Sequence, residues 1–202
     1  MRKIRRFFIF FVLFSAFLFI KPVVNAESKI NGSDNIVMVG ASIRTTGVQG
    51  LRFIAQVDID AFLEEQNIEI NEITKYGIVL SLGEANCDNL YIGGTVNGKN
   101  TLNGESSSLF NPETNEFTVV LYNINESLYL QGFSARGYIK YNDGSEKVVY
   151  SKDIITRSIY EVAKKSLVEN ELEYPRNVVN YVDNTLCKDV KDINAAKALY
   201  ET

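Results

Sequence analysis

The sequence contains no histidine and no tryptophan, and it has only two cysteines and three prolines in 202 residues. The absence of histidine excludes Ser-His-Asp and Cys-His catalysis, because both need an imidazole that accepts the proton of the nucleophile. It also excludes every zinc site with a histidine ligand, and two cysteines alone do not form a tetrahedral site. The sequence therefore excludes histidine-dependent hydrolases and peptidases, and it predicts no structural zinc.

The two cysteines, Cys87 and Cys187, lie far apart in the chain. If the protein is exported, an oxidising environment favours a disulfide between them. Two cysteines do not define a disulfide framework, so two free or buried thiols are the other interpretation. The sequence leaves both interpretations open.

Other catalytic motifs are missing as well. Residues 132–137 are one residue too long for a nucleophile elbow, and residues 93–95 lack the ending of a phosphate-binding loop. Pairs of carboxylates, which suffice for a glycosidase, remain as candidates. They are drawn from Glu64, Glu65, Asp88, Glu126 and Asp143. Simpler roles on a solvated helix face or in a turn account for these acids better. We therefore expect a protein that is not an enzyme and that has no metal site and no cofactor.

The one long hydrophobic run lies at the N-terminus. Basic residues at positions 2, 3, 5 and 6 precede an apolar run over residues 7–20, and Val24-Asn25-Ala26 then places small apolar residues at the two positions that a signal peptidase reads. This order predicts a secretory signal peptide over residues 1–26 that is cleaved after Ala26. The run is shorter than the roughly 20 residues that span a bilayer, so a retained anchor is the weaker alternative. We expect a secreted or cell-surface protein with no membrane span after cleavage.

Cleavage makes the chain more acidic. Five of the 21 basic residues precede the cleavage point and all 25 acidic residues follow it, so the mature chain has 16 basic residues and a net charge of −9. Such a chain repels nucleic acids on average, and we expect no nucleic-acid partner.

Residues 36–151 show the apolar alternation and the Gly and Asn turns that are typical of β-strands. Asn97-Gly98 is the strongest hairpin signal, because both residues accept positive φ. A short helix is expected over residues 60–66. The expected strands cover residues 36–43, 51–57, 76–82, 90–96, 117–122, 131–141 and 147–150.

From Asp153 onward the apolar period becomes helical, and Pro175 fits the first turn of a further helix. A last short helix is expected over residues 193–200. We therefore predict an α+β fold. An antiparallel β-sandwich of about seven or eight strands would form residues 27–151, and C-terminal helices over residues 152–202 would pack on the same domain. A partly closed barrel is the alternative.

Three side chains are candidates for a ligand-binding surface. Arg52, Arg136 and Tyr138 lie on the polar faces of their predicted strands. An arginine in such a place binds a carboxylate or phosphate through two parallel hydrogen bonds, and a tyrosine stacks on a planar group. The alternative is ordinary ion pairing with acids on neighbouring strands.

Several short motifs follow one another along the chain: Gly40-Ala41-Ser42-Ile43-Arg44, Gly50-Leu51-Arg52-Phe53, Tyr76-Gly77, Phe133-Ser134-Ala135-Arg136-Gly137-Tyr138, Asp143-Gly144, Tyr150-Ser151 and Arg157-Ser158-Ile159-Tyr160. In this order they resemble a module that recurs in exported and surface proteins of Gram-positive bacteria. The resemblance covers about residues 36–170. It implies an extracellular, β-rich, non-catalytic module.

Two function classes follow from these observations. The first is a secreted or surface binding module for a glycan, a wall polymer or a protein. The second is a structural or assembly domain of the cell surface that has no small ligand and contacts its partners through a sheet edge or the C-terminal helices. Only the first class predicts binding to a glycan panel.

Overall fold

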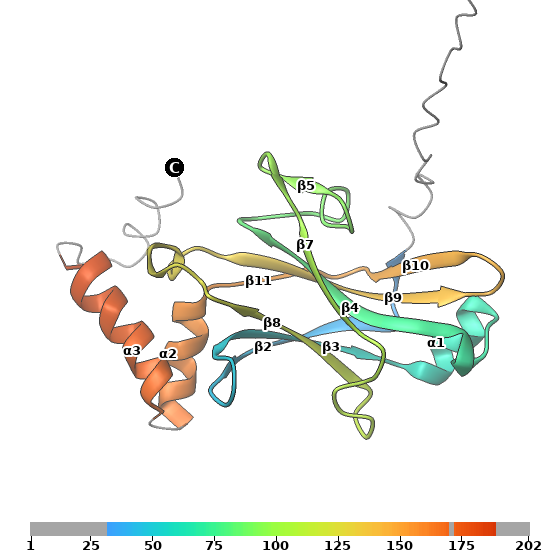
Figure 1. The fold of residues 1–202 in the computed structure, drawn as a ribbon, viewed down its shortest axis with the longest axis horizontal. Helices are drawn as coiled ribbons and strands as arrows, with labels where there is room; N and C mark the ends of the chain where they lie inside the picture. Colours follow the sequence, from blue (N-terminus) through green and yellow to red (C-terminus); the bar gives the residue numbers. More distant parts are fainter. Residues whose placement is uncertain (1–31, 170–171, 189–202) are drawn as a thin grey trace, which may run out of the picture.

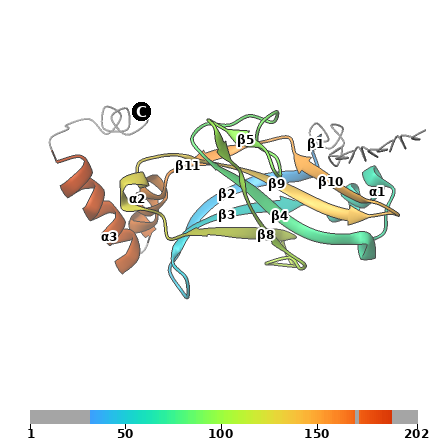
Figure 2. The ribbon, with the colours of Figure 1, turned by 45° about the horizontal axis from the view of Figure 1, so that its top comes forward.

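The computed structural model describes residues 32–169 and 172–188, which form a mixed α/β structure made mostly of β-sheet. Figure 1 shows two sheets along the length of the molecule, with helices α2 and α3 at one end. The turn between β9 and β10 lies with helix α1 at the other end, as Figure 2 also shows. Neither sheet closes on itself, so the barrel alternative is wrong for this part of the chain. Within the described residues, no helix is long and apolar enough to span a membrane.

The larger sheet has six strands, and its main order is β1-β10-β9-β4-β7. The short strand β11 (Ile155–Arg157) pairs with the start of β9. All pairs are antiparallel except β1 with β10. The bounds are β1 Gly32–Ser33, β4 Ile73–Leu82, β7 Leu102–Ser106, β9 Phe133–Asn142 and β10 Glu146–Ser151.

The smaller sheet has three antiparallel strands in the order β2-β3-β8, with β2 at Ile36–Arg44, β3 at Gly50–Val57 and β8 at Glu116–Tyr122. Side chains of β3 alternate strictly. Leu51, Phe53, Ala55 and Val57 are buried, whereas the residues between them are partly exposed. A two-stranded hairpin, β5 (Thr95–Val96) and β6 (Lys99–Asn100), turns at Asn97 and Gly98, whose φ angles are 49° and 73°. The hairpin predicted at Asn97-Gly98 is confirmed.

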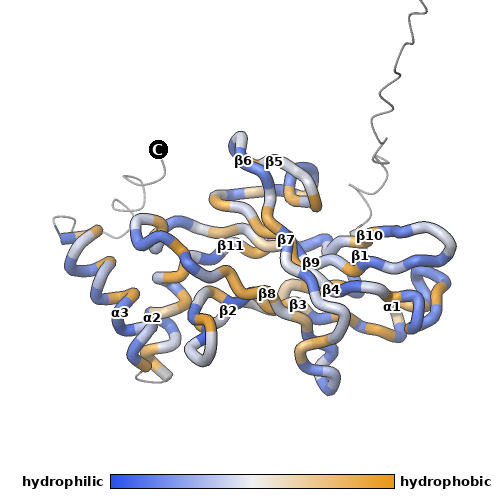
Figure 3. Tube along the Cα trace, in the orientation of Figure 1, coloured by the Kyte–Doolittle hydropathy of each residue, from blue (hydrophilic) through white to orange (hydrophobic). Residues whose placement is uncertain are grey.

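The main hydrophobic core lies between the two sheets. A Cβ atom at Gly137 of β9 would lie 3.2 Å from Cβ of Ala55 and 3.3 Å from Cγ2 of Ile36, so the two sheets pack closely face to face here. Figure 3 shows hydrophobic stretches along β3 and β8 and a hydrophilic turn between β9 and β10. The polar outer side of β3 therefore faces away from this core.

Three α-helices complete the described structure. Helix α1 (Ile59–Gln66) begins where Asp58 Oδ1 accepts the N–H of Ala61, and it ends at Asn67 in the left-handed conformation. Helix α2 (Ile159–Glu169) begins after a reciprocal pair of hydrogen bonds between Ser158 and Glu161, a capping box. Helix α3 (Glu173–Tyr181) continues into a π turn over Val182–Leu186, and short 3-10 turns occupy Ile70–Glu72 and Glu126–Leu128.

Most of the predicted strands are confirmed, but two local predictions are wrong. Residues 90–96 form a strand only at Thr95–Val96. The helix predicted from Asp153 starts later, because residues 155–157 pair with β9 and Asp153 Oδ2 accepts the N–H of Met38. The signal peptide predicted over residues 1–26 and the helix predicted over residues 193–200 lie outside the described residues.

Candidate functional site

Arg136 is buried and does not form a surface. It is 2% exposed, and its guanidinium donates to the carbonyls of Ser151 at 2.8 Å and Cys87 at 2.9 Å, with a longer contact to Leu90 at 3.4 Å. Burial lowers the pKa of Arg136, and the guanidinium lies over the ring of Tyr150 at 4.8 Å. Arg136 therefore does not lie on the exposed polar face that the sequence predicted, because its guanidinium points inward to the backbone carbonyls of Ser151, Cys87 and Leu90.

Tyr138 is also buried, with an exposed fraction of 0%. Its ring crosses the neighbouring strand at Gly77, where a Cβ atom would lie 2.2 Å from Tyr138 Cζ. The hydroxyl donates to Glu105 Oε2 at 3.1 Å, and Lys140 pairs with the same carboxylate at 2.9 Å. Because Gly77 has no side chain, the ring of Tyr138 can pass over β4 and reach Glu105 of β7. The predicted placement of Tyr138 on an exposed polar face is wrong.

A second apolar cluster explains both corrections. Residues 83–96 cover the outer side of β9, where Tyr138 and Tyr150 pack with Val79, Leu90 and Val96. The face predicted to be polar and solvent-exposed is therefore a second buried layer. In addition, Arg52 and Arg136 belong to different sheets and lie on opposite sides of the main core, so the three predicted residues do not form one site.

The two cysteines are free thiols in the structure. Cys87 Sγ lies 3.3 Å from the carbonyl oxygen of Lys152, and Cys187 packs against the main core after the π turn. Burial raises the pKa of Cys187, with a smaller contribution from Asp183. Of the two interpretations that the sequence left open, the structure has the free thiols.

Arg52 is the predicted site residue that stays at the surface. It lies on the outer side of β3, between Ser42 of β2 and Val120 of β8. Its guanidinium carbon lies 5.0 Å from the ring centroid of Phe110, whose side chain is 57% exposed. Arg52 Nε is buried and has no hydrogen-bond partner among the described residues. Burial lowers the pKa of Arg52, and the charge of Arg44 adds to this effect.

Arg44 and Tyr122 extend this surface toward the β2–β3 turn. Arg44, Gly50 and Tyr122 are register partners across the three strands, and Tyr122 is 57% exposed. Arg44 Nε donates to the carbonyl of Thr46 at 3.0 Å, which holds its side chain over its own turn. The three-stranded sheet thus presents two arginines and two aromatic rings on its outer side. We call this set, Arg44, Arg52, Phe110 and Tyr122, the arginine face.

A groove borders the same sheet next to helix α2. Its volume is about 520 Å³, and its lining comes from β2, β3, Arg157 and α2. Ile54 contributes to it, and Ile54 follows Arg52 by two residues on the same side of β3. The remaining lining residues are Val39, Gly40, Ala41, Arg157, Glu161, Val162 and Lys165.

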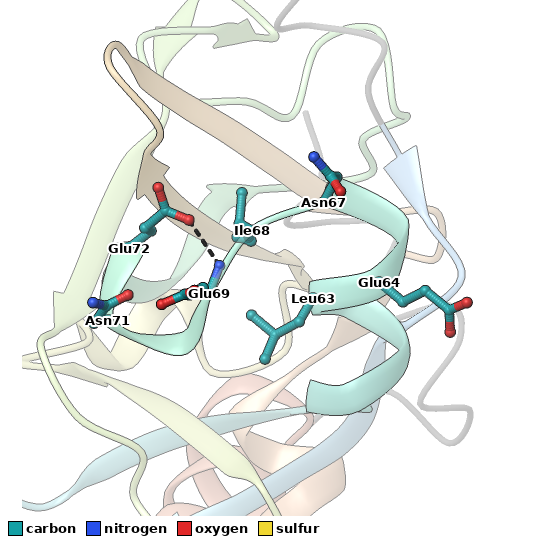
Figure 4. A pocket seen from close by; sticks show the side chains of 7 residues that line it. All are labelled: Leu63, Glu64, Asn67, Ile68, Glu69, Asn71 and Glu72. Carbon is teal, nitrogen blue, oxygen red and sulfur yellow. Dashed lines mark hydrogen bonds between the residues drawn. The ribbon is translucent and has the colours of Figure 1, made fainter.

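A wider hollow of about 650 Å³ lies between α1 and the turn at Ile70–Glu72, but its polar groups serve local structure. Figure 4 shows Glu64 pointing away from Glu69 and Glu72. Glu72 Oε2 accepts the N–H of Glu69 at 2.7 Å, which caps the short turn.

Two of the acids that were candidates for catalysis have structural partners. Glu65 Oε2 accepts hydrogen bonds from Ser33 and Asn35, and Asp143 pairs with Lys147 at 2.6 Å. Within the described residues no three acidic or cysteine side chains gather closely enough to hold a metal ion.

Sequence reasoning missed Phe110 and the groove. Phe110 is the single aromatic residue in the polar stretch over residues 103–116, and that isolation was the available signal. Nothing in the strand pattern predicted that Arg157 and Lys165 would border the outer side of β2 and β3. The chain matches no protein-family model, no curated protein and no solved structure.

Proposed function

We propose that this protein is a secreted or cell-surface, non-catalytic binding module that uses the arginine face as its ligand-binding surface. We further propose that the two sheets form an antiparallel sandwich of the extracellular kind that the sequence motifs resemble. The observation that carries the proposal is the Arg52 guanidinium. It is partly buried against Phe110, it has no ion pair among the described residues, and its buried Nε lacks an acceptor.

An anionic group on the ligand would pair with the guanidinium of Arg52, which is partly exposed. A carboxylate or phosphate offers two acceptors that match the fork of the terminal N–H groups of an arginine. The same anion would reduce the mutual repulsion of Arg44 and Arg52. This pair of like charges without an acidic partner is unusual in a chain with more acidic than basic residues.

The two exposed rings support a ligand with flat apolar faces. Phe110 and Tyr122 each leave more than half of their surface open to solvent, and exposed aromatic side chains with arginine are enriched at binding hot spots. A glycan, an acidic wall polymer or a protein segment offers such faces next to anionic groups. The absence of histidine and the structural roles of the acids support binding without catalysis.

The proposal is tested with a panel of neutral and acidic polysaccharides and isothermal titration of the mature protein. We expect acidic chains to bind and neutral chains to bind weakly or not at all. Arg52→Gln should weaken the binding of the acidic chains by about tenfold or more. Lys99→Gln, which removes an exposed cation from β6, is the matched control and should leave binding unchanged. Failure of every acidic chain to bind would contradict the proposal.

The second candidate function is assembly through a sheet edge. Strand β7 is the last strand on its side of the larger sheet, and Leu102 in it is an exposed large apolar residue. An assembly domain would associate through this edge in solution. Light scattering over a range of concentrations tests it, because Leu102→Lys would then abolish an association that the unchanged chain shows.

A further inference from the structure

We infer that the ligand is a linear acidic glycan that runs along the outer side of the three-stranded sheet, from the arginine face into the groove beside helix α2. This inference rests on the proposed function and names its ligand class. It adds Arg157 and Lys165 to the binding surface, together with the apolar floor of the groove.

The two parts of the surface are continuous along β3. Arg52 and Ile54 point to the same side of this strand and lie roughly 7 Å apart, because a strand rises about 3.3 Å per residue. Ile54 also lines the groove, and its register partner Gly40 lies there as well. A bound chain that contacts Arg52 therefore needs to extend by only a few ångströms to enter the groove.

The groove suits a sugar chain with anionic groups. Its floor is apolar, formed by Val39, Ile54 and Val162. Val39 is an exposed large apolar residue next to the irregularity in β2 pairing between Met38 and Gly40. Apolar floors of this kind pack against the C–H faces of sugar rings, whereas cations at the rim bind the charged substituents.

The cations of the groove form no ion pair with a described acid, although Glu161 lines the same groove. Arg157 donates to the carbonyl of Thr156 at 2.8 Å, and neither it nor Lys165 forms an ion pair among the described residues. The acid in the groove, Glu161, accepts the N–H of Ser158 as part of the α2 cap. Together with Arg44 and Arg52, these residues place four cations along one side of the molecule.

Two acids on this side are Glu116 and Glu161. Glu116 pairs with Gln56 at the opposite end of β3 from Arg44, and Glu161 is held by its cap. Cations that are spread along a path, rather than gathered at one point, match charges that repeat along a polymer. A small anion would engage only one end of this surface, so affinity should rise with ligand length.

The test compares oligogalacturonates of different lengths, from the disaccharide to the octasaccharide, by isothermal titration of the mature protein. We expect the octasaccharide to bind at least about tenfold more tightly than the disaccharide, and to lose affinity as salt is added. The double variant Arg157→Gln/Lys165→Gln should weaken the octasaccharide by about tenfold and leave the disaccharide nearly unchanged. Arg52→Gln should weaken both.

The outcomes separate this inference from the proposed function. If both lengths bind equally and only Arg52→Gln reduces binding, the site is a single anion pocket and the inference is overturned while the proposed function stands. If no oligogalacturonate binds at any length, the inference is overturned, whereas the proposed function is decided by the wider panel of acidic chains. Equal binding of single-stranded oligothymidylate would replace the glycan with a nucleic acid and would also overturn the inference.

Discussion

Arg136 is the one nearly fully buried charged residue in the part of the chain that the structure describes, and it acts as a cross-link. From β9 it reaches the carbonyl of Ser151 on β10 and two carbonyls of the loop at residues 87–90. No described carboxylate forms an ion pair with it, although the charges of Asp88 and Asp153 favour its protonated form, so the guanidinium depends mainly on these carbonyl dipoles and on the ring of Tyr150. Arg136, which the sequence suggested as a ligand contact, therefore stabilises the fold.

Replacing Arg136 with methionine should destabilise the protein by about 2 to 4 kcal/mol, because buried carbonyls lose a charged donor. Urea denaturation of the mature protein measures the change in the free energy of unfolding. Arg157→Met is the control, since Arg157 is exposed, and it should change stability by no more than about 0.5 kcal/mol. Equal midpoints for the two variants would mean that the loop does not depend on Arg136.

Gly77 and Tyr138 form a complementary pair, and each depends on the other. Gly77→Ala places a methyl group 2.2 Å from Tyr138 Cζ and should cost about 3 kcal/mol or more. Tyr138→Ala should cost about 3 to 5 kcal/mol, at least as much as Phe133→Ala, since the ring of Tyr138 is fully buried. In the double variant Gly77→Ala/Tyr138→Ala the two losses should be clearly less than additive. Additive losses in urea denaturation would contradict the close contact.

At the scale of the elements, the predicted exposure of side chains was wrong where another segment of the chain covers the face of a strand. Phe133, Ala135 and Ile139 alternate with polar residues, which is the pattern of a strand with one solvent-exposed side. This pattern located β9 correctly. The pattern contains no signal that residues 83–96 fold over the other side, because the hydrogen bonds that join them to this face involve Arg136 and Tyr150, which lie far along the chain. Arg136 and Tyr138 were misassigned for this reason, whereas Arg52 on the uncovered sheet was placed correctly on an outer face.

The ion pair between Glu105 of β7 and Lys140 of β9 should weaken as the pH falls. The hydrogen bond from Lys140 lowers the pKa of Glu105 below its ordinary value of 4.5, and Tyr138 contributes less. A carboxylate with a lowered folded-state pKa stabilises the fold above the unfolded pKa, and this contribution disappears as the pH falls through the folded pKa. Stability should therefore decline as the pH falls below about 4.5. Glu105→Gln should be less stable at neutral pH and should show a shallower decline. Parallel stability–pH curves for the two proteins would contradict this role of Glu105.

At the scale of the whole molecule, both cysteines should remain reduced. The structure has Cys87 and Cys187 as free thiols, one beside Lys152 and the other against the core after the π turn. Protein purified from the culture medium without reductant and unfolded in iodoacetamide should gain the mass of two alkyl groups. An alkylated mass without any added group would indicate a disulfide and a different placement of the C-terminal helices.

The general architecture was accessible from the sequence because it depends on short-range patterns. Strand alternation, the Asn97-Gly98 turn and Pro175 in the first turn of α3 are local signals, and they located most of the elements. The pairing of strands and the sides that stay exposed depend on contacts between residues far apart in the chain. Phe110 beside Arg52, and Lys165 beside Ile54, are such contacts, so the arginine face and the groove became visible only in three dimensions.

The most direct measurement of the central claim is a nuclear magnetic resonance titration of the isotope-labelled mature protein with galacturonate octasaccharide. We predict that the largest amide shifts fall in β2, β3, β8 and the first half of α2, with Arg52 and Ile54 among them. Amides of α1 and the Ile70–Glu72 turn, at the opposite end of the molecule, should remain unchanged. Shifts confined to that opposite end, or no shifts at saturating ligand, would contradict the account.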